Sequence, residues 1–556
     1  MTESRPTPAL VTQRAVARLP RMALLLLCAA YVLPGMFGRD PWKSADITAY
    51  GYMISLLRGE AAWLAPSLAG LPADGSVLPY WIGAASMALL SPWIDPALAA
   101  RIPFALLLAA TLALVWYATL HLARTEAAQP VAFAFGGEAH PVDYARAIAD
   151  GALLAMIAPL GLLQLGHETT PELVQLAATA LLTYGLAASP YRPHASRISV
   201  LVALVVLAAS GAATMALLLA LTGALVCWQS SYPESRRLTG WLVLGAALSA
   251  AVATGLDAWV WRLDPVDDAV ALARLGLWFT WPVWPLVGWT LWHWRRHLQR
   301  RHLAVPLASV LVAVSACVGM GGSDRALMLA LPGMAVLAAF ALPTMRRSVS
   351  AAIDWFSVFF FTVCALAIWV IYLSLHAGVP AQPAANVMRL APGFVPHFEW
   401  LPLLIALLGT GAWLALVRWR TGWHRQALWK SLVLPAGGVA LSWLLLMTLW
   451  LPVLDYARSY RPLVERLARH LPPQGCVAAP NFTRGQLAAL EVHGHWRLTL
   501  DPRPLDCHWM LLTQQERVGT PATAQVRPAP PGWTLVASER RPTDRDEVIL
   551  IYRRQR

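Results

Sequence analysis

Four charged side chains of both signs crowd a short segment just after the first apolar run of the sequence. Arg39, Asp40, Lys43 and Asp46 lie between positions 39 and 46. Two cations next to two carboxylates can bind a phosphate group and leave one carboxylate free to accept a proton. The alternative is a solvated helix end, whose long side chains reach water beside an interfacial Trp42.

An imidazole and a carboxylate stand side by side at the end of a later apolar run. His167 and Glu168 precede Thr170, Pro171 and Glu172. The last three residues form a good helix start, with a capping hydroxyl, a proline at the first helical position and an acid at the positive end of the helix dipole. Glu172 therefore needs no further role. His167 and Glu168 could bind a divalent metal or form an acid–base pair, although two adjacent ligands without a third are a weak metal signal.

A third group lies in a glycine-rich turn between two apolar runs. Gly321 and Gly322 allow close approach of the backbone to a ligand, and Asp324 and Arg325 follow them. An arginine at a helix start suits an anionic phosphate, and the alternative is an Asp–Arg pair that closes the turn. The stretch 376–398 is long for a connection, so it is either a lid over a site or a mobile loop.

The composition indicates which elements must position these side chains. The chain of 556 residues is 58% hydrophobic and 13% charged, against about 25% charged residues in a soluble globular protein. We expect an α-helical polytopic membrane protein with about thirteen transmembrane helices, since each span needs about 20 residues. The apolar runs that could cross a bilayer are 22–38, 102–120, 145–165, 172–189, 198–210, 212–228, 240–260, 276–294, 303–320, 326–343, 354–375, 400–417 and 431–453.

The basic residues set the expected orientation. The net charge of +13 comes from short Lys and Arg clusters between apolar runs, which favours membrane topology over nucleic-acid binding. With the N-terminus in the cytoplasm these clusters fall on one face, and an odd number of spans places the chain after about 454 outside. Segment 79–94 is too short to span, so we expect it to be interfacial or re-entrant. The membrane module is then 1–453, with a first outer loop at 39–101.

We predict that residues 454–556 form a separate small α/β domain on the outer side. In this part of the sequence the share of charged residues rises and the apolar runs shrink to strand length. The predicted strands are 475–479, 506–512, 533–537 and 547–552, and the predicted helix is 484–492. Cys476 and Cys507 open two of these strands in an oxidising compartment. We expect a disulfide between them, and two buried thiols are the alternative.

Several segments of the membrane module resemble one known family. They are Asp40-Pro41-Trp42-Lys43 with Asp46, the stretch 68–75 that ends in Asp74-Gly75, then Leu78-Pro79-Tyr80-Trp81, and Ala100-Arg101-Ile102-Pro103. Together they resemble the N-terminal module of the bacterial aminoarabinose transferase and related protein-mannosyltransferase-type glycosyltransferases of the GT-C superfamily. The resemblance covers about 1–350. The chain departs from the family in its first loop, where Ser44-Ala45-Asp46-Ile47 replaces Pro-Asp-Glu, and at Val77-Leu78-Pro79, which replaces Pro-Pro-Leu.

The resemblance implies an enzyme of the bacterial inner membrane, with a cytoplasmic N-terminus and a periplasmic C-terminal domain. Such enzymes move a sugar, with inversion, from an undecaprenyl-phosphate carrier to a periplasmic lipid or glycan acceptor such as lipid A. By position, the family's acids fall on Asp40 or Asp46, on Glu168, and on Asp74, near Tyr80. The departures leave the choice between Asp40 and Asp46 open.

Other groups would complete such a site. Arg325, with Arg39 or Lys43, would stabilise the charge that builds up on the departing phosphate. A divalent cation held near Glu168 or Asp74 could assist as a Lewis acid. The rival interpretation is a polytopic transporter or lipid flippase, which would carry charged residues in the middle of its spans, where this sequence has almost none.

Overall fold

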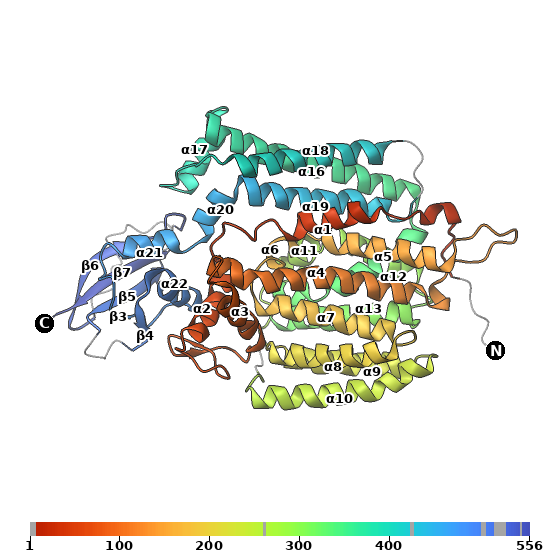
Figure 1. Ribbon diagram of the computed structural model, residues 1–556, viewed down its shortest axis with the longest axis horizontal. Helices are drawn as coiled ribbons and strands as arrows, with labels where there is room; N and C mark the ends of the chain where they lie inside the picture. The colour runs from red at the N-terminus through yellow and green to blue at the C-terminus, as the bar shows by residue number, and fades with distance from the viewer. Residues whose placement is uncertain are drawn as a thin grey trace.

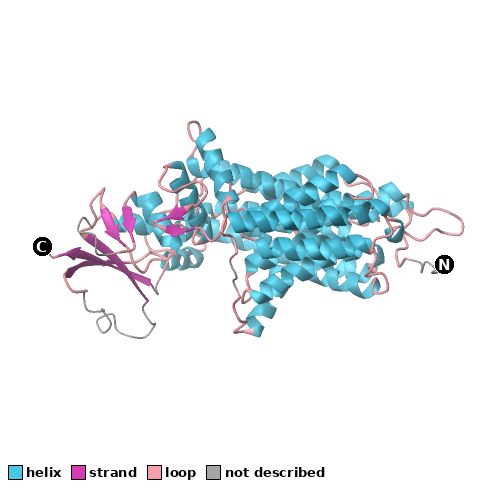
Figure 2. Ribbon diagram, turned by 90° about the horizontal axis from the view of Figure 1, so that it is seen from below, coloured by secondary structure: helices cyan, strands magenta, loops and turns pink. Residues whose placement is uncertain are grey.

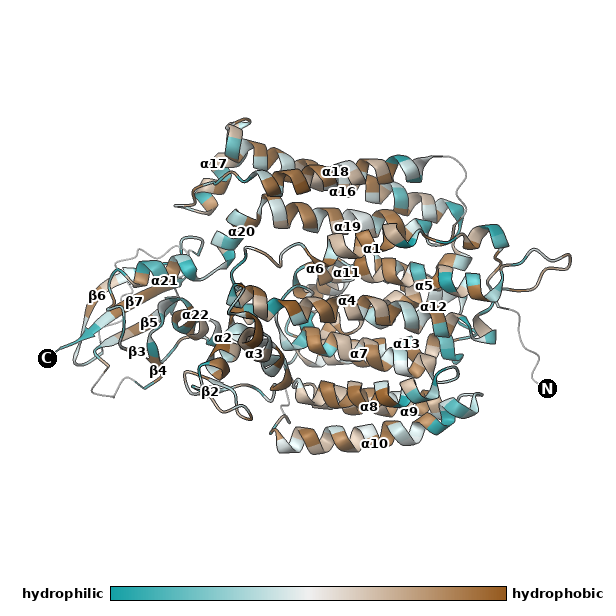
Figure 3. Ribbon diagram, in the orientation of Figure 1, coloured by the Kyte–Doolittle hydropathy of each residue, from teal (hydrophilic) through white to brown (hydrophobic). Residues whose placement is uncertain are grey.

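The protein consists of a long helical bundle with a small α/β domain at one end (Figure 1). A computed structural model describes residues 7–259, 263–422, 427–501, 507–515, 530–544 and 547–555. The two termini lie at opposite ends of the molecule, and the strands gather near the C-terminus (Figures 1 and 2). Apolar residues cover the bundle, whereas hydrophilic residues concentrate at its ends and in the tail (Figure 3).

The helices of the bundle run for the most part roughly parallel (Figure 1). They are α1 (Arg21–Val32), α4 (Pro96–Ala123), α5 (Pro141–Ile157), α7 (Pro171–Ala188), α8 (Pro193–Ala209), α9 (Ala213–Trp228), α10 (Pro233–Gly255), α11 (Ala269–Phe279), α12 (Val283–His293), α13 (Arg301–Gly319), α15 (Leu331–Ala339), α16 (Arg347–Ala377), α18 (Trp400–Thr421) and α19 (Lys430–Leu449). Helices α15 and α19 are almost wholly buried, whereas α18 is largely exposed at the edge.

Shorter helices connect the bundle to the tail or close its turns. They are α2 (Ala45–Leu57), α3 (Leu78–Leu90), α6 (Leu162–Leu165), α14 (Asp324–Met328), α17 (Ala381–Leu390), α20 (Leu451–Arg458), α21 (Arg461–Leu467) and α22 (Arg484–Gly494). Single 3-10 turns occupy Gln13–Val16, Glu126–Ala128 and Leu342–Thr344.

Each apolar run expected to span contains a helix, but not every helix is long enough to cross a bilayer. In the described part of the chain, seven helical segments have the length and composition of a span. The pair α11 and α12, bent by 91°, would make an eighth. Four further apolar helices, α1, α3, α8 and α9, are shorter. The expected number of about thirteen spans is therefore not established, because the runs 22–38, 198–210 and 212–228 contain the shorter helices α1, α8 and α9.

The first outer loop folds as two helices and a small hairpin. Helix α2 packs on α3, and β1 (Ser67–Leu68) pairs with β2 (Leu71–Pro72) between them. Helix α3 has 13 residues, fewer than the roughly 20 that a span requires. This agrees with an interfacial or re-entrant segment at 79–94. Further along the chain, the stretch 376–398 contains α17, and Tyr456 of α20 donates a hydrogen bond of 2.7 Å to the Pro392 carbonyl.

The tail is a five-stranded mixed sheet with helices α21 and α22. The strands are β3 (Cys476–Ala478), β4 (Arg497–Thr499), β5 (Trp509–Gln515), β6 (Trp533–Glu539) and β7 (Glu547–Arg554), in the order β4-β3-β5-β7-β6. Strands β3, β4 and β5 are parallel, and β7 pairs antiparallel with β5 and β6. Helix α22 begins at a capping box of Thr483 and Gln486. The predicted strands and helix are confirmed for the described residues. Residue 506 lies outside them, and the three-residue β4 was not predicted.

Cys476 and Cys507 form the disulfide that the sequence predicts, with their Cα atoms 4.7 Å apart. The bond joins the start of β3 to the residue two positions before β5 and closes a loop of 31 residues. Replacing both residues with Ala is expected to lower the unfolding free energy of the tail by about 3–4 kcal/mol. Thermal unfolding of the purified chain, monitored by limited proteolysis of the tail, measures this loss of stability. Equal protease resistance of the variant and the parent would contradict it.

Candidate active site

Asp46 is the centre of a buried hydrogen-bond network at the end of the bundle that faces the tail. It lies in the first turn of α2, where the helix dipole favours a negative charge. Its Oδ2 accepts hydrogen bonds from Arg39 Nη2 (3.1 Å) and from the backbone N–H of Trp42 (3.2 Å). Its Oδ1 accepts from the backbone N–H and the hydroxyl of Thr169, both at 2.8 Å. The carboxylate is 1% exposed.

These partners decide the charge of Asp46. Burial alone would raise the pKa of the carboxyl, but the nearby Arg39 and Arg101 guanidinium groups and the two hydrogen bonds from Thr169 outweigh it and lower the pKa. Asp46 is therefore held ionised, and its lone pairs are occupied by fixed donors.

Glu168 lies in the turn between α6 and α7 and is 2% exposed. Its Oε1 accepts a hydrogen bond from Gln164 Nε2 (2.8 Å), and its Oε2 pairs with Arg325 Nη2 (2.6 Å). Burial raises the pKa of Glu168, and the negative charge of Asp46 raises it further against the opposing effect of Arg325. Arg325 comes from α14, and it also lies 3.4 Å from Glu172.

The backbone segment 167–169 joins the two carboxylates into one site. The Arg39 guanidinium donates to the His167 carbonyl (3.0 Å), Glu168 follows, and Thr169 then donates to Asp46. Two neighbouring carboxylates whose pKa values move in opposite directions are typical of a site that divides acid–base work between them. Here Glu168, whose pKa is raised, is the easier of the two to protonate, and Asp46, whose pKa is lowered, is the fixed charge.

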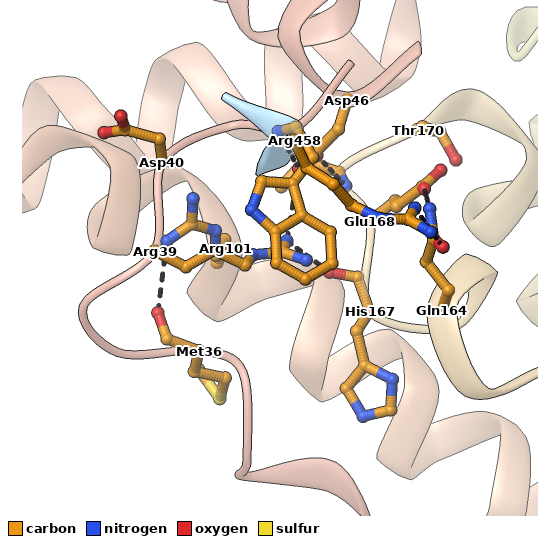
Figure 4. A network of polar contacts seen from close by, with 12 residues as sticks. Met36, Arg39, Asp40, Asp46, Arg101, Gln164, His167, Glu168, Thr170 and Arg458 are labelled. Atoms are coloured by element: carbon orange, nitrogen blue, oxygen red, sulfur yellow. Dashed lines mark hydrogen bonds and ion pairs between the residues drawn. The ribbon is translucent and has the colours of Figure 1, made fainter. Parts of the chain in front are cut away.

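Arginines surround this pair of carboxylates, and some of their N–H groups are unpaired. Arg39 and Arg458 both lie over the ring of Trp42, with their Cζ atoms 4.6 and 5.4 Å from its centroid. Arg101 donates to the Met36 carbonyl at 3.2 Å (Figure 4). Among the described residues, Arg39 Nε and Nη1 and Arg101 Nη2 are buried without a hydrogen-bond partner. Unpaired buried donors of charged groups are costly, so these atoms favour an anionic ligand at this position.

Asp40 and Lys43, expected in the same site, face the tail instead. The carboxylate of Asp40 accepts hydrogen bonds from Arg461 at 2.5 and 2.8 Å and from Ser459 at 2.8 Å. Burial raises the pKa of Asp40, but these hydrogen bonds outweigh it and lower the pKa. Lys43 Nζ lies 3.8 Å from Asp544. Figure 4 shows Asp40 pointing away from Glu168. These two residues thus hold the tail against the first loop.

Asp74 and Tyr80 lie in a second contact between the first loop and the tail. Asp74 forms a bidentate ion pair with Arg484 of α22, at 2.5 and 2.7 Å. Tyr80 is buried and packs on Tyr52, with ring centroids 4.9 Å apart. Asp74 therefore has a structural partner that the sequence interpretation did not include.

The expected metal site at His167 and Glu168 does not fit the residues present. Both ring nitrogens of His167 face backbone carbonyls, Nδ1 that of Leu163 (2.7 Å) and Nε2 that of Tyr31 (2.8 Å). Burial lowers the pKa of His167 to about 4, so it is neutral. Among the described residues no group of three or more His, Cys, Asp or Glu side chains converges as metal ligands. No step of the chemistry below is therefore assigned to a metal.

The glycine turn contributes Arg325 but not Asp324. The Asp324 carboxylate accepts a hydrogen bond of 2.8 Å from the Arg325 backbone N–H, so it stabilises the start of α14. Three further residues of the site were not among the predicted site residues. Arg101 was detectable as a cation in an apolar run. Arg458 and Gln164 gave no local signal, because they meet across 294 residues of sequence, at 2.5 Å.

Known structures share this fold. The crystal structure of ArnT from Cupriavidus metallidurans bound to undecaprenyl phosphate matches with a TM-score of 0.57 and 13% identity, over 96% of this chain and 96% of that chain. The structure of the same protein in the apo state matches with the same TM-score and identity, over 95% and 96%. No protein-family model matches the sequence, and no curated protein matches it. The expected likeness to the aminoarabinose transferase fold is confirmed.

Proposed function

We propose that this protein is a glycosyltransferase of the bacterial inner membrane that moves a sugar from an undecaprenyl-phosphate-linked donor to an acceptor on the outer face. The observation that supports this most is the buried site in which Asp46 and Glu168 lie beside Arg39, Arg101 and Arg458. A carboxylate able to exchange a proton next to unpaired guanidinium N–H groups suits a reaction that releases a phosphate. The fold shared with ArnT, solved with undecaprenyl phosphate bound, supports this donor.

The reaction is a single displacement with inversion. The acceptor hydroxyl attacks the anomeric carbon and loses its proton to Glu168, while the bond between that carbon and the carrier phosphate breaks. The bonding electrons leave with the phosphate oxygen. Arg39 and Arg101 stabilise the charge that develops there, because their unpaired N–H groups are preorganised in a buried site.

Arg325 has a different role from the one expected. It is paired with Glu168 rather than free for a phosphate. As Glu168 takes up the acceptor proton, this ion pair loses its Coulomb attraction, and the Arg325 guanidinium becomes available to the leaving phosphate. Asp46 keeps Arg39 and Thr169 in place, and its negative charge keeps the pKa of Glu168 raised.

The position of the site within the bundle fits an enzyme better than a transporter. The charged cluster is built from the loop after α1, the turn before α7 and α20, all at the end of the bundle that faces the tail (Figure 1). A transporter would place its binding charges near the middle of the spans. With the N-terminus in the cytoplasm, this end lies at the periplasmic surface, where the donor's sugar is presented.

A transfer assay tests the proposal. Purified protein in lipid vesicles is mixed with radiolabelled undecaprenyl-phosphate sugars and crude envelope acceptors, and label is followed from the carrier to the acceptor. We expect transfer by the parent chain without any nucleotide-sugar. Label that crosses the vesicle membrane but stays on its carrier would instead identify a flippase, and failure with every donor would overturn the proposal.

A further inference from the structure

A cavity of about 1190 Å³ lies in the bundle away from the site described above. Helix α19 forms its floor, and α1 and α18, which pack on either side of α19, form its walls (Figure 1). None of the residues of the candidate active site lines it. The cavity is therefore separate from the candidate active site.

The cavity is lined mainly by apolar residues, and its length is close to the thickness of one leaflet of a bilayer. Small residues on the facing helices, such as Ala412 of α18 and Ala440 of α19, leave the space open. The lining follows α19 from Lys430 to Leu444, which is about 21 Å at 1.5 Å per residue. Half of the hydrocarbon core is about 15 Å. The length suits one acyl chain and its glycerol, and it is short for a long polyprenyl chain.

The end of the cavity that Arg14, Arg18, Arg420 and Lys430 line, called its mouth below, carries positive charge. Its lining includes four cations, Arg14, Arg18, Arg420 and Lys430, and no acidic residue. Among the described residues, Asp143 pairs with Arg18 at 3.2 Å, and Asp354 pairs with Arg420 and also interacts with the charge of Lys430. The mouth thus keeps more positive than negative charge. Trp419 and Trp429 also line this end, as expected where a lipid headgroup meets the acyl region.

We propose that this cavity binds an anionic glycerophospholipid of the inner leaflet. One acyl chain fills the apolar groove between α1 and α18, and the phosphate lies among the basic residues at the mouth. The sugar donor is excluded as the natural occupant by position, since the mouth is at the N-terminal end of the bundle, opposite the buried carboxylates (Figure 1). The bound lipid would support α1, whose Tyr31 carbonyl contacts His167 beside Glu168.

Lipid retention by the full chain tests this without any sugar transfer. The protein is exchanged into detergent with equal amounts of phosphatidylglycerol and phosphatidylcholine of matched chains, and bound lipid is counted by native mass spectrometry. We expect a preference for phosphatidylglycerol of about tenfold. The double variant Arg14→Gln/Lys430→Gln should bring the preference close to onefold. The double variant Arg21→Gln/Arg418→Gln, at the same membrane face but outside the lining, should keep it.

A second pair of variants tests the groove itself. Ala412→Leu places a larger side chain in the cavity and should lower retention of both lipids. Gly411→Leu is its control, because a side chain at Gly411 meets no atom within 4 Å and this residue does not line the cavity. Equal retention of the two lipids by the parent, retention unaffected by Ala412→Leu, or displacement of phosphatidylglycerol by a polyprenyl phosphate would each overturn the proposal.

Discussion

Replacing Glu168 with Gln is expected to lower sugar transfer by about 10²–10⁴-fold, the usual contribution of a general base. The amide has nearly the same shape as the carboxylate and can still accept a hydrogen bond from Arg325 through its carbonyl oxygen. It cannot take up the acceptor proton at neutral pH. The loss should therefore appear in kcat, with donor binding largely kept. Single-turnover transfer and separate binding of the labelled donor measure the two quantities.

The matched control for this variant is Glu172→Gln. Glu172 contacts the same guanidinium, that of Arg325, at 3.4 Å and lies in the first turn of α7. It is the same residue type as Glu168 but only supports the helix start, so its loss should change transfer less than about twofold, in line with the small energy of a partly exposed ion pair. If both variants lose transfer equally, the effect belongs to Arg325 and not to proton transfer by Glu168.

The pH dependence of transfer by the parent chain follows from the same residue. A base must be deprotonated to act, so kcat/KM should rise with pH through the pKa of Glu168 and then level off. Because burial and Asp46 raise that pKa above the ordinary value for a glutamate, the acidic limb should lie at a higher pH than a solvated carboxyl would give. A profile that is flat over the acidic range would contradict Glu168 as the base.

The sequence alone was sufficient to find the site residues that lie in short charged segments at the ends of apolar runs. Asp46, Arg39, Glu168 and Arg325 were predicted from charge at the ends of apolar runs, and the structure places all four in one network. The pattern works because a charge at a membrane boundary is costly unless it has a partner or a ligand. The signal therefore marks the positions that need partners, although it does not say which partners they have.

The same signal failed where the partner lies in the tail. Asp40 pairs with Arg461 across 421 residues, and Asp74 pairs with Arg484 across 410. From the sequence alone, an acid that holds a domain interface and an acid that holds a substrate look identical. Only the packing of α22 against the first loop, and the contact of Arg461 in α21 with Asp40, separate Asp40 and Asp74 from the catalytic candidates. The number of about thirteen spans is not established, because several of the apolar runs fold into helices shorter than the roughly 20 residues of a span.

Replacing Asp46 with Asn is expected to lower the unfolding free energy by about 3–5 kcal/mol, the usual cost of leaving a buried ion without its partner. Arg39 and Asp46 are almost fully buried, with side-chain exposures of 0% and 1%. Removing the carboxylate leaves the Arg39 guanidinium without its ion-pair partner, although it still interacts with the charge of Asp455. Thermal unfolding of the purified variant in detergent measures this. Asp40→Asn is the control, because its partner Arg461 is 54% exposed and the loss should be much smaller.

The stability cost of Asp46→Asn can be checked by also removing the charge that this substitution leaves unpaired on Arg39. The double variant Arg39→Gln/Asp46→Asn removes both ions, so it should be more stable than Asp46→Asn alone, and a double-mutant cycle isolates the pair. Acid provides a second check. The pKa of Asp46 is lowered in the folded protein, so its stabilisation is present at neutral pH and disappears as the pH falls through the folded pKa. The difference in thermal stability between the parent and Asp46→Asn should therefore shrink in acid.

Asp46→Asn should also shift the pH profile of whatever activity remains. The negative charge of Asp46 raises the pKa of Glu168, so its removal lowers that pKa and moves the acidic limb of kcat/KM to lower pH. A purely structural role for Asp46 would lower activity at every pH without moving the limb. If the limb stays in place while Glu168→Gln still abolishes transfer, the two carboxylates act independently, and the division of labour inferred from their opposite pKa shifts is wrong.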